Sequence, residues 1–326
     1  MMDKDENASK ETSGPEWERN LLERLAFASL NEQRRARRWS IGFKLFFAGY
    51  LVLSGYLVLL FVIASTERLP ETPTGEFTAL VDMEGIIAPN MPASADYVVD
   101  GLRGAFESKA KGVILRTNSP GGSPVQAGYI SDEINRLREK YPKKPFYAVV
   151  GDICASGCYY AVAAADKIFV NQASIVGSIG VLMDGFGFVD SLNKLGIERR
   201  LMTAGDNKAI LDPFSPVNPS HKAHVQKMLN EIHQQFIEVV KEGRGQALKD
   251  GKEIFSGLLW TGEKAVQLGL VDELGSAGYV AREVIGAEKI VDFTYRENLL
   301  DRFAQRLGTT MAHTMGAEIL GSARLR

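Results

Sequence analysis

The hydrophobic pattern separates the chain into one membrane-type segment and one folded domain. The run from Leu45 to Ala64 contains no charged side chain. A helix of this length extends ~30 Å, which matches the hydrocarbon core of a bilayer. A buried core helix is the alternative, but the run is apolar on every side, and Trp39 and charged residues flank it. We therefore predict a transmembrane signal anchor over residues 41–65, with residues 45–64 in the membrane.

Basic side chains gather on the N-terminal side of this run, at Arg34, Arg35, Arg37 and Arg38. Positive charge stays on the cytoplasmic side of a membrane helix. We therefore predict a polar and basic cytoplasmic tail over residues 1–40, a linker over residues 66–76, and a remainder on the far side of the membrane. A cleaved signal peptide is the alternative, but the polar segment before the run is long for one.

After the linker, short apolar runs alternate with segments of helical spacing. The predicted strands are Phe77–Ile87, Gly112–Arg116, Pro145–Val150, Lys167–Val170, Ile175–Met183 and Glu198–Met202. The predicted helices are Asp96–Lys109, Gln126–Lys140, Phe188–Leu195 and Pro219–Ala247. This alternation predicts a layered α/β domain with largely parallel strands over residues 77–292. Residues 293–326 form an amphipathic extension that could pack on a neighbouring protomer or contact the membrane.

Ser156 stands at the end of an apolar strand and before an alanine-rich helical segment, in the sequence Cys-Ala-Ser-Gly-Cys. A tight turn between a strand and a helix exposes its side chain and points backbone N–H groups at whatever lies there. Serine before glycine is also an ordinary turn or N-cap sequence. Ser156 is thus a candidate nucleophile that requires an activating base.

A second glycine turn, Pro120-Gly121-Gly122, follows another predicted strand. Parallel strands deliver their carboxyl ends to the same edge of a sheet, so this turn is expected near Ser156. An N–H of Gly121 or Gly122 on one side and that of Gly157 on the other would form an oxyanion hole. A plain turn is the alternative interpretation.

The base is harder to find from composition. His221, His224 and His233 lie on one predicted helix, where a solvated face is their ordinary place, and His313 lies in the C-terminal extension. Lys208 stands in a loop with apolar residues on its C-terminal side, and burial can lower a lysine's pKa far enough for it to act as a base. Ser178, in Gly-Ser-Ile-Gly, is a candidate to orient that amine.

Charge and cysteine content exclude several other classes of site. The formal net charge of −2 gives no indication of a nucleic-acid partner. Cys154 and Cys158 bracket Ser156. Their i to i+4 spacing across a sharp turn suggests small buried packing residues rather than a disulfide, and without nearby histidines they make a poor zinc site. The glycine turns lack the P-loop pattern, so we expect neither metal nor cofactor.

Taken together, the motifs around Gly121, Ser156, Ser178 and Lys208, in this order and spacing, resemble the signal peptide peptidase A family over roughly residues 77–290. The resemblance is to the short, membrane-anchored form, and it implies a diderm source in which the inner (cytoplasmic) membrane holds the anchor and the catalytic domain is periplasmic. It implies a crotonase/Clp-protease-like α/β fold, Ser156 as nucleophile, Lys208 as general base and Ser178 as its hydrogen-bond partner. It also implies a homo-oligomer in which a lysine of one protomer meets the serine of the next, and apolar or remnant signal peptides as substrates. The chain departs from the family at Cys158, where a second glycine is usual.

Three alternatives stay open on the sequence. A non-proteolytic crotonase-like protein would share the glycine turns without needing Ser156 or Lys208. A Clp-type protease would use a histidine base. An anchored oligomeric scaffold would use the C-terminal segment, residues 298–326, to bind partners.

Overall fold

The computed structural model describes residues 15–66, 75–249 and 251–296, and the chain divides into two units, Met1–Thr72 and Pro73–Arg326. Most of the predicted linker and of the C-terminal extension lies outside the described residues, and so does His313.

The described part of the N-terminal unit is one helix, α1 (Pro15–Thr66). Its stretch Glu32–Leu60 is long and apolar enough to cross a membrane, and none of its most apolar window is buried against the rest of the chain. Such a helix must place its apolar side chains in a non-aqueous environment, which agrees with the predicted anchor. The helix begins at Pro15, so a large part of the predicted polar tail is helical.

Among the described residues, eight strands form a single sheet. They are β1 (Thr78–Glu84), β2 (Gly112–Ser119), β3 (Phe146–Ala155), β4 (Lys167–Val170), β5 (Ile175–Gly177), β6 (Leu259–Thr261), β7 (Glu273–Leu274) and β8 (Ile290–Asp292). The order β6-β5-β3-β2-β1-β8 is parallel except at β5–β6, and β4 pairs with both β3 and β7. The first half of β3 pairs with β4 and its last residues pair with β5, so β3 reaches farther than its neighbours.

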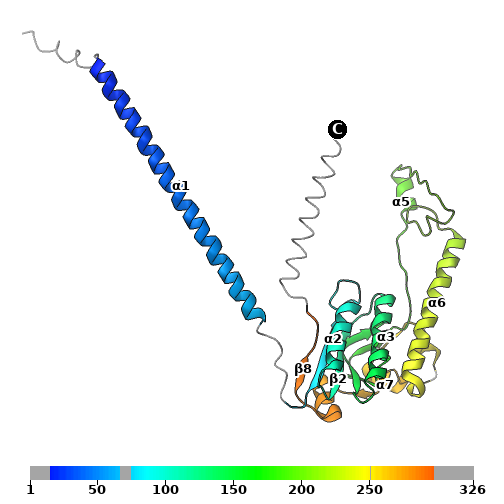
Figure 1. Ribbon diagram of the computed structural model, residues 1–326. Helices are drawn as coiled ribbons and strands as arrows, with labels where there is room; N and C mark the ends of the chain where they lie inside the picture. Colours follow the sequence, from blue (N-terminus) through cyan, green and yellow to red (C-terminus); the bar gives the residue numbers. More distant parts are fainter. Residues whose placement is uncertain (1–14, 67–74, 250, 297–326) are drawn as a thin grey trace, which may run out of the picture. The chain divides into compact units, whose positions relative to one another are not determined.

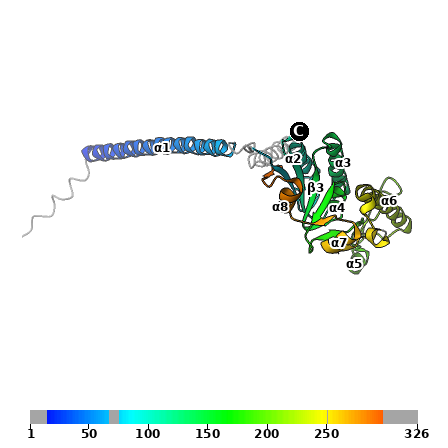
Figure 2. The same cartoon turned by 90° about the horizontal axis from the view of Figure 1, so that it is seen from below.

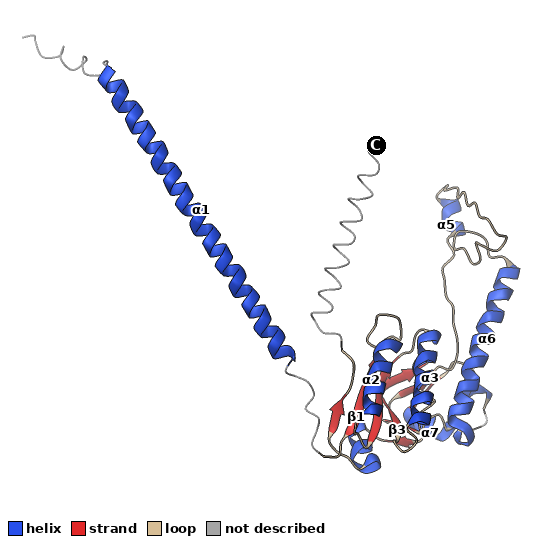
Figure 3. Cartoon of the chain, viewed as in Figure 1, coloured by secondary structure: helices blue, strands red, loops and turns tan. Residues whose placement is uncertain are grey.

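Helices cover the two faces of this sheet unequally. They are α2 (Ala95–Glu107), α3 (Pro124–Lys140), α4 (Gly157–Val162), α5 (Val189–Lys194), α6 (Pro219–Arg244), α7 (Gly262–Leu268) and α8 (Ala277–Tyr279), with short turns η1 (Gly245–Ala247), η2 (Lys252–Phe255) and η3 (Val280–Ile285). Figure 2 shows α3 and α4 on one side of β3 and α8 on the other, and Figure 3 shows α2 and α3 packed across the strands.

The period-two alternation of the strands explains these layers. In β1, Val81 and Met83 face the larger core beneath α2 and α3, whereas Leu80 faces a smaller core beneath α8 and η3. Apolar side chains form both cores. The predicted layered α/β fold is therefore confirmed.

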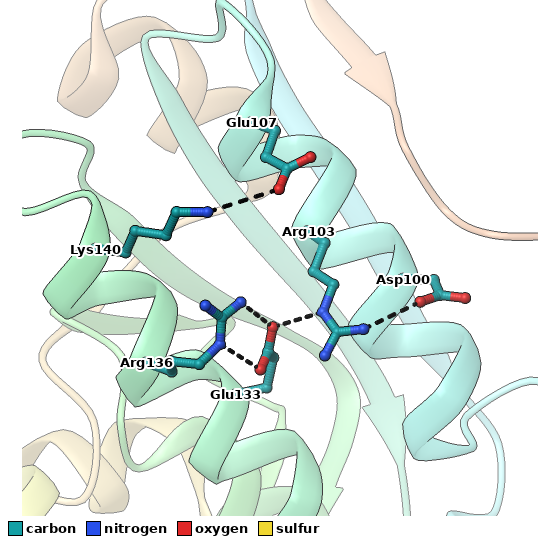
Figure 4. Close-up of polar contacts among 6 residues, drawn as sticks. All are labelled: Asp100, Arg103, Glu107, Glu133, Arg136 and Lys140. Atoms are coloured by element: carbon teal, nitrogen blue, oxygen red, sulfur yellow. Dashed lines mark hydrogen bonds and ion pairs between the residues drawn. The ribbon is translucent and has the colours of Figure 1, made fainter.

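An ion-pair network joins α2 to α3 at the edge of the larger core (Figure 4). The Glu133 carboxylate accepts hydrogen bonds from Arg103 Nε at 2.7 Å and from Arg136 Nη2 at 2.6 Å. These hydrogen bonds, with that from Arg136 the strongest cause, lower the pKa of Glu133 to about 2. The network fixes α3, and α3 begins directly after the Gly121–Gly122 turn.

The segment from residue 180 to residue 218, here called the arm, joins β5 to α6. Figure 1 shows it with α5 at the N-terminal end of α6, away from the sheet. Within the arm, the Phe188 ring stacks on Phe214 with centroids 5.5 Å apart, and the Phe188 N–H donates to the Pro213 carbonyl at 2.7 Å. The arm thus has local structure of its own but little core.

Two strand predictions fail here. The predicted strand Glu198–Met202 is irregular, and β5 ends at Gly177 instead of continuing to Met183. Both segments end in apolar side chains, Leu201–Met202 and Val181–Met183, but among the described residues no strand lies beside them to complete a ladder. Arg199 instead pairs with the Asp212 carboxylate across the arm.

Candidate active site

Ser156 occupies the sharp turn between β3 and α4, as predicted. Its backbone has φ 54° and ψ −126°, a conformation that costs a non-glycine residue about 1–3 kcal/mol. Two hydrogen bonds hold it: the Ser156 N–H donates to the Gly177 carbonyl at 2.9 Å, and the Tyr160 N–H donates to the Ser156 carbonyl at 3.0 Å. The half-buried hydroxyl bonds to no other described residue, so it is free for chemistry.

The structure brings the Gly121–Gly122 turn against Ser156. A Cβ on Gly121 would lie 2.6 Å from the Ala155 carbonyl oxygen and 2.8 Å from Ser156 Cβ. With φ +96° at Gly121 as well, only glycine permits this approach. The turn is fixed from its other side by Ile87, whose N–H donates to the Gly121 carbonyl at 2.9 Å.

Two backbone N–H groups are unused where these turns meet. A Cβ on Gly157 would lie 3.3 Å from the Gly122 nitrogen, so the two amides are close neighbours. Neither N–H donates to another described residue, whereas the Gly121 N–H donates to Ser119 Oγ at 3.1 Å. The geometry therefore singles out Gly122 over Gly121 as the donor that faces the site together with Gly157.

Ser178 leaves the sheet beside Ser156. Ala155 pairs with Gly177 in the parallel ladder of β3 and β5, so the two serines follow paired positions on strands ~4.8 Å apart. Ser178 has φ 52°, and its N–H donates to the Leu258 carbonyl at 2.7 Å. Ser178 is thus placed in the same turn region as the candidate nucleophile.

Lys208 lies far from both serines within one chain. It is exposed in the arm, and its neighbour Asn207 bonds through Oδ1 to Nε2 of His221 at 3.0 Å, in the first turn of α6. His233, twelve residues farther along α6, meets the Ile179 carbonyl at 3.1 Å. Those twelve residues correspond to ~18 Å of helix, so Lys208 lies about that far from the level of Ser178.

Sequence reasoning missed the place of His233. The ring of this half-buried histidine reaches the backbone one residue after Ser178. The signal was its position beside the apolar stripe of α6, whose Phe236 packs in the core. His221 contacts the arm instead, and His224 is exposed.

The prediction that Cys154 and Cys158 are unpaired is wrong. The structure joins them in a disulfide with Cα atoms 5.2 Å apart, and both are buried. The left-handed turn at Ser156 causes this, because it directs α4 back so that the two Cα atoms come within bonding range. Within the residues that the structure describes, no cluster of three or more His, Cys, Asp or Glu side chains could hold a metal ion.

The wall behind the turn is largely apolar, and the two charged groups that act on Tyr159, Arg244 and Asp272, form an ion pair with each other. Burial raises the pKa of Tyr159, whose hydroxyl donates to the Leu270 carbonyl at 2.6 Å. Burial also raises the pKa of Tyr160, whose ring packs 5.2 Å from Phe236. Both phenols therefore stay neutral at ordinary pH and serve as packing groups.

Comparison with known proteins gives the family of this chain. Peptidase family S49 matches residues 138–290. A putative protease of Methanocaldococcus jannaschii is 34% identical over 218 residues, covering 65% of this chain and 69% of that protein. The chain belongs to the signal peptide peptidase A family, peptidase family S49. A putative signal peptide peptidase SppA of Enterococcus faecium is 30% identical over 271 residues, covering 79% of this chain and 78% of the relative.

The family match contains Ser156, Ser178 and Lys208, and it begins after the Gly121–Gly122 turn. A Brucella abortus protein named as a Na(+)/H(+) antiporter NhaA is 45% identical over 186 residues, or 57% of this chain. The chain spans only 25% of that protein's length, so the shared segment is one part of a larger relative.

Proposed function

We propose that this S49-family chain is a membrane-anchored serine endopeptidase with a Ser156–Lys208 dyad, which degrades remnant signal peptides and other apolar peptides. The observation that carries the proposal is the meeting of a strained serine turn with two unused N–H groups, those of Gly122 and Gly157. A non-proteolytic fold member has no need of a free hydroxyl at that point.

In the proposed reaction, the Ser156 hydroxyl attacks the substrate carbonyl while the neutral Lys208 amine takes its proton. The N–H groups of Gly122 and Gly157 stabilise the resulting oxyanion, each by about 3 kcal/mol. The ammonium returns the proton to the leaving amine, which leaves an acyl-enzyme on Ser156. A water then attacks the ester with the same base and frees the serine. Ser178 orients the lysine.

The lysine that serves each Ser156 is proposed to come from a second copy of the chain. Within one chain, Lys208 lies ~18 Å from the level of Ser178 along α6. The arm that bears it exposes large apolar side chains, among them Leu182 (82% exposed), Phe186 (79%) and Met202 (93%). Exposed apolar surface of this extent is typical of an interface.

The anchor would keep this assembly at the membrane. Positive charge before the apolar stretch favours a cytoplasmic N-terminus, with the sheet domain beyond the inner membrane. A hydrophobic peptide left in the bilayer after protein export would then lie within reach of the site.

The experiment is labelling of the detergent-solubilised full chain with a serine-directed phosphonate, with cleavage of an apolar fluorogenic peptide measured alongside. We expect Ser156→Ala to abolish both, and Lys208→Ala to abolish cleavage. Labelling that survives Ser156→Ala would end the nucleophile assignment. Cleavage that survives Lys208→Ala but is lost in His233→Ala would replace the lysine by a histidine base.

A further inference from the structure

We propose that the Cys154–Cys158 disulfide is a positioning bond for the Ser156 nucleophile, so that its reduction lowers kcat while the domain stays folded. This inference rests on the proposed function of Ser156. The bond closes a small loop that contains only Ala155, Ser156 and Gly157 between its two cysteines.

The two ends of the bond belong to elements of different rigidity. Cys154 lies inside the sheet, where it pairs with Ser119 of β2 on one side and with Val176 of β5 on the other. Cys158 lies in the first turn of α4, a helix of 6 residues. Helices this short have little stability of their own, because few hydrogen bonds offset the cost of nucleation. The disulfide therefore attaches a weak helix to a rigid sheet.

The residue between them needs such an attachment. Ser156 is held in a left-handed conformation that a serine rarely adopts, and such residues persist only where their surroundings fix them. Two backbone hydrogen bonds contribute, to Gly177 and from Tyr160. The bond adds a covalent constraint across the same residue, and it also sets where the Gly157 N–H points. Without it, the turn can relax toward a conformation in which hydroxyl and N–H no longer converge.

The chemistry is a two-electron thiol–disulfide exchange. A dithiol reductant attacks one sulfur to form a mixed disulfide, then closes to its own disulfide and releases two thiols in the protein. The reverse reaction, with a small disulfide as oxidant, restores the bond. Because both cysteines are buried, the exchange requires local opening of α4. The redox state of the compartment then sets the fraction of molecules that have the disulfide and are fully active.

The test compares oxidised and dithiothreitol-reduced full chain, with free thiols counted in each. We expect no free thiol in the oxidised protein. On reduction, kcat and the rate of phosphonate labelling should fall together by about tenfold, KM should stay within about twofold, and a disulfide oxidant should restore both. The folded signal in near-UV circular dichroism should remain.

Variants separate the bond from the packing of the two side chains. Cys154→Ala, Cys158→Ala and the double variant each lack the same bond, so each should match the reduced wild type and ignore dithiothreitol. If the double variant lost as much kcat as the two single losses combined, the effect would come from the packing of the two side chains. That result would overturn the proposal.

Three other results would also overturn it: two free thiols in the oxidised protein, unchanged kcat after complete reduction, or loss of the folded signal together with kcat. Cleavage that persists in Ser156→Ala would instead refute the proposed function, which keeps the two failures distinct.

Discussion

Ser156 stands in a tight turn of the sheet domain and Lys208 stands in the long arm, and the two segments differ in how the chain holds them. Around Ser156, backbone hydrogen bonds, a disulfide and the close approach of Gly121 fix the turn from every side. Around Lys208, the side chains are exposed, and the closest atom to a Cβ on nearby Gly205 would be Lys208 Cβ itself at 4.0 Å. The proposed nucleophile is therefore held by its own chain, whereas the proposed base is exposed on the arm.

The comparison therefore separates a turn that its own chain supports from an arm whose exposed apolar surface is proposed to meet a second copy. The turn at Ser156 is bracketed by Cys154 and Cys158, which belong to the larger apolar core, and its described contacts come from its own chain. The arm leaves its apolar groups in water when alone. Variants made in pairs, one near the Ser156 turn and one in the arm, test this difference.

The largest expected effect is on activity. Ser156→Ala and Lys208→Ala should each lower kcat/KM by on the order of 10⁴-fold or more, because members of one catalytic unit fail together. Thermal unfolding of the sheet domain should be unchanged in both. A Lys208→Ala variant with near-normal kcat/KM would remove the arm from the chemistry.

The next effect distinguishes two glycines with similar backbone conformation. Gly121 has φ +96° and Gly205 has φ +103°. Gly121→Ala meets backbone atoms at 2.6 Å and should lower the free energy of unfolding in urea by more than about 3 kcal/mol. Gly205→Ala meets open space and should cost only about 1 kcal/mol, from strain at positive φ. Equal costs at the two positions would contradict the contrast between a fixed turn and a free loop.

A pH effect follows from the carboxylate that joins α2 to α3. Hydrogen bonds from Arg136 and Arg103 lower the pKa of Glu133 to about 2, from 4.5. Its stabilisation of the fold is therefore fully present above pH 4.5 and is lost as pH falls toward 2, by about 3 kcal/mol in all. Glu133→Gln should remove that slope from the pH dependence of unfolding.

The matched carboxylate in the arm is Asp212. Hydrogen bonds from Ser215 and Arg199 lower its pKa. Asp212→Asn should leave the global unfolding curve of the sheet domain in place at every pH, because the arm adds little to either core. A global destabilisation comparable to that of Glu133→Gln would show that the arm is part of the same cooperative unit.

The smallest expected effect concerns assembly. Met202→Glu, at the exposed surface of the arm, should weaken self-association by at least tenfold in sedimentation of the solubilised chain and reduce activity in a concentration-dependent way. Leu274→Glu is the control, since Leu274 is also exposed (50%) but lies on β7, away from the arm. Equal sedimentation of the two variants would argue against the arm as an interface.

Much of this arrangement could be predicted from the sequence, because it depends on local rules. Short apolar runs identified most strands, and parallel pairing accounts for the Gly121 turn lying beside Ser156. The Cys154–Cys158 bond could not be predicted in the same way, since it depends on the handedness of one turn. The strand expected at Glu198–Met202 failed because a strand needs a neighbour, and periodicity does not say whether one exists.

The base poses a different problem for sequence reasoning. The spacing between Ser156 and Lys208 along the chain is the same whether the two meet within a protomer or between protomers. Only the course of the arm along α6 separates these cases, and that course is fixed by tertiary contacts such as His221 with Asn207 and His233 with Ile179.

Mixing two inactive proteins tests directly whether Lys208 of one copy serves Ser156 of another. Ser156→Ala retains the lysine and Lys208→Ala retains the serine, so subunit exchange between them should restore peptide cleavage to a substantial fraction of wild type if the base is donated from a neighbouring copy. Each variant alone should stay inactive at the same concentration. Sedimentation would show whether both chains are present in one assembly. If they are and no peptide is cleaved, a neighbouring copy does not donate the base.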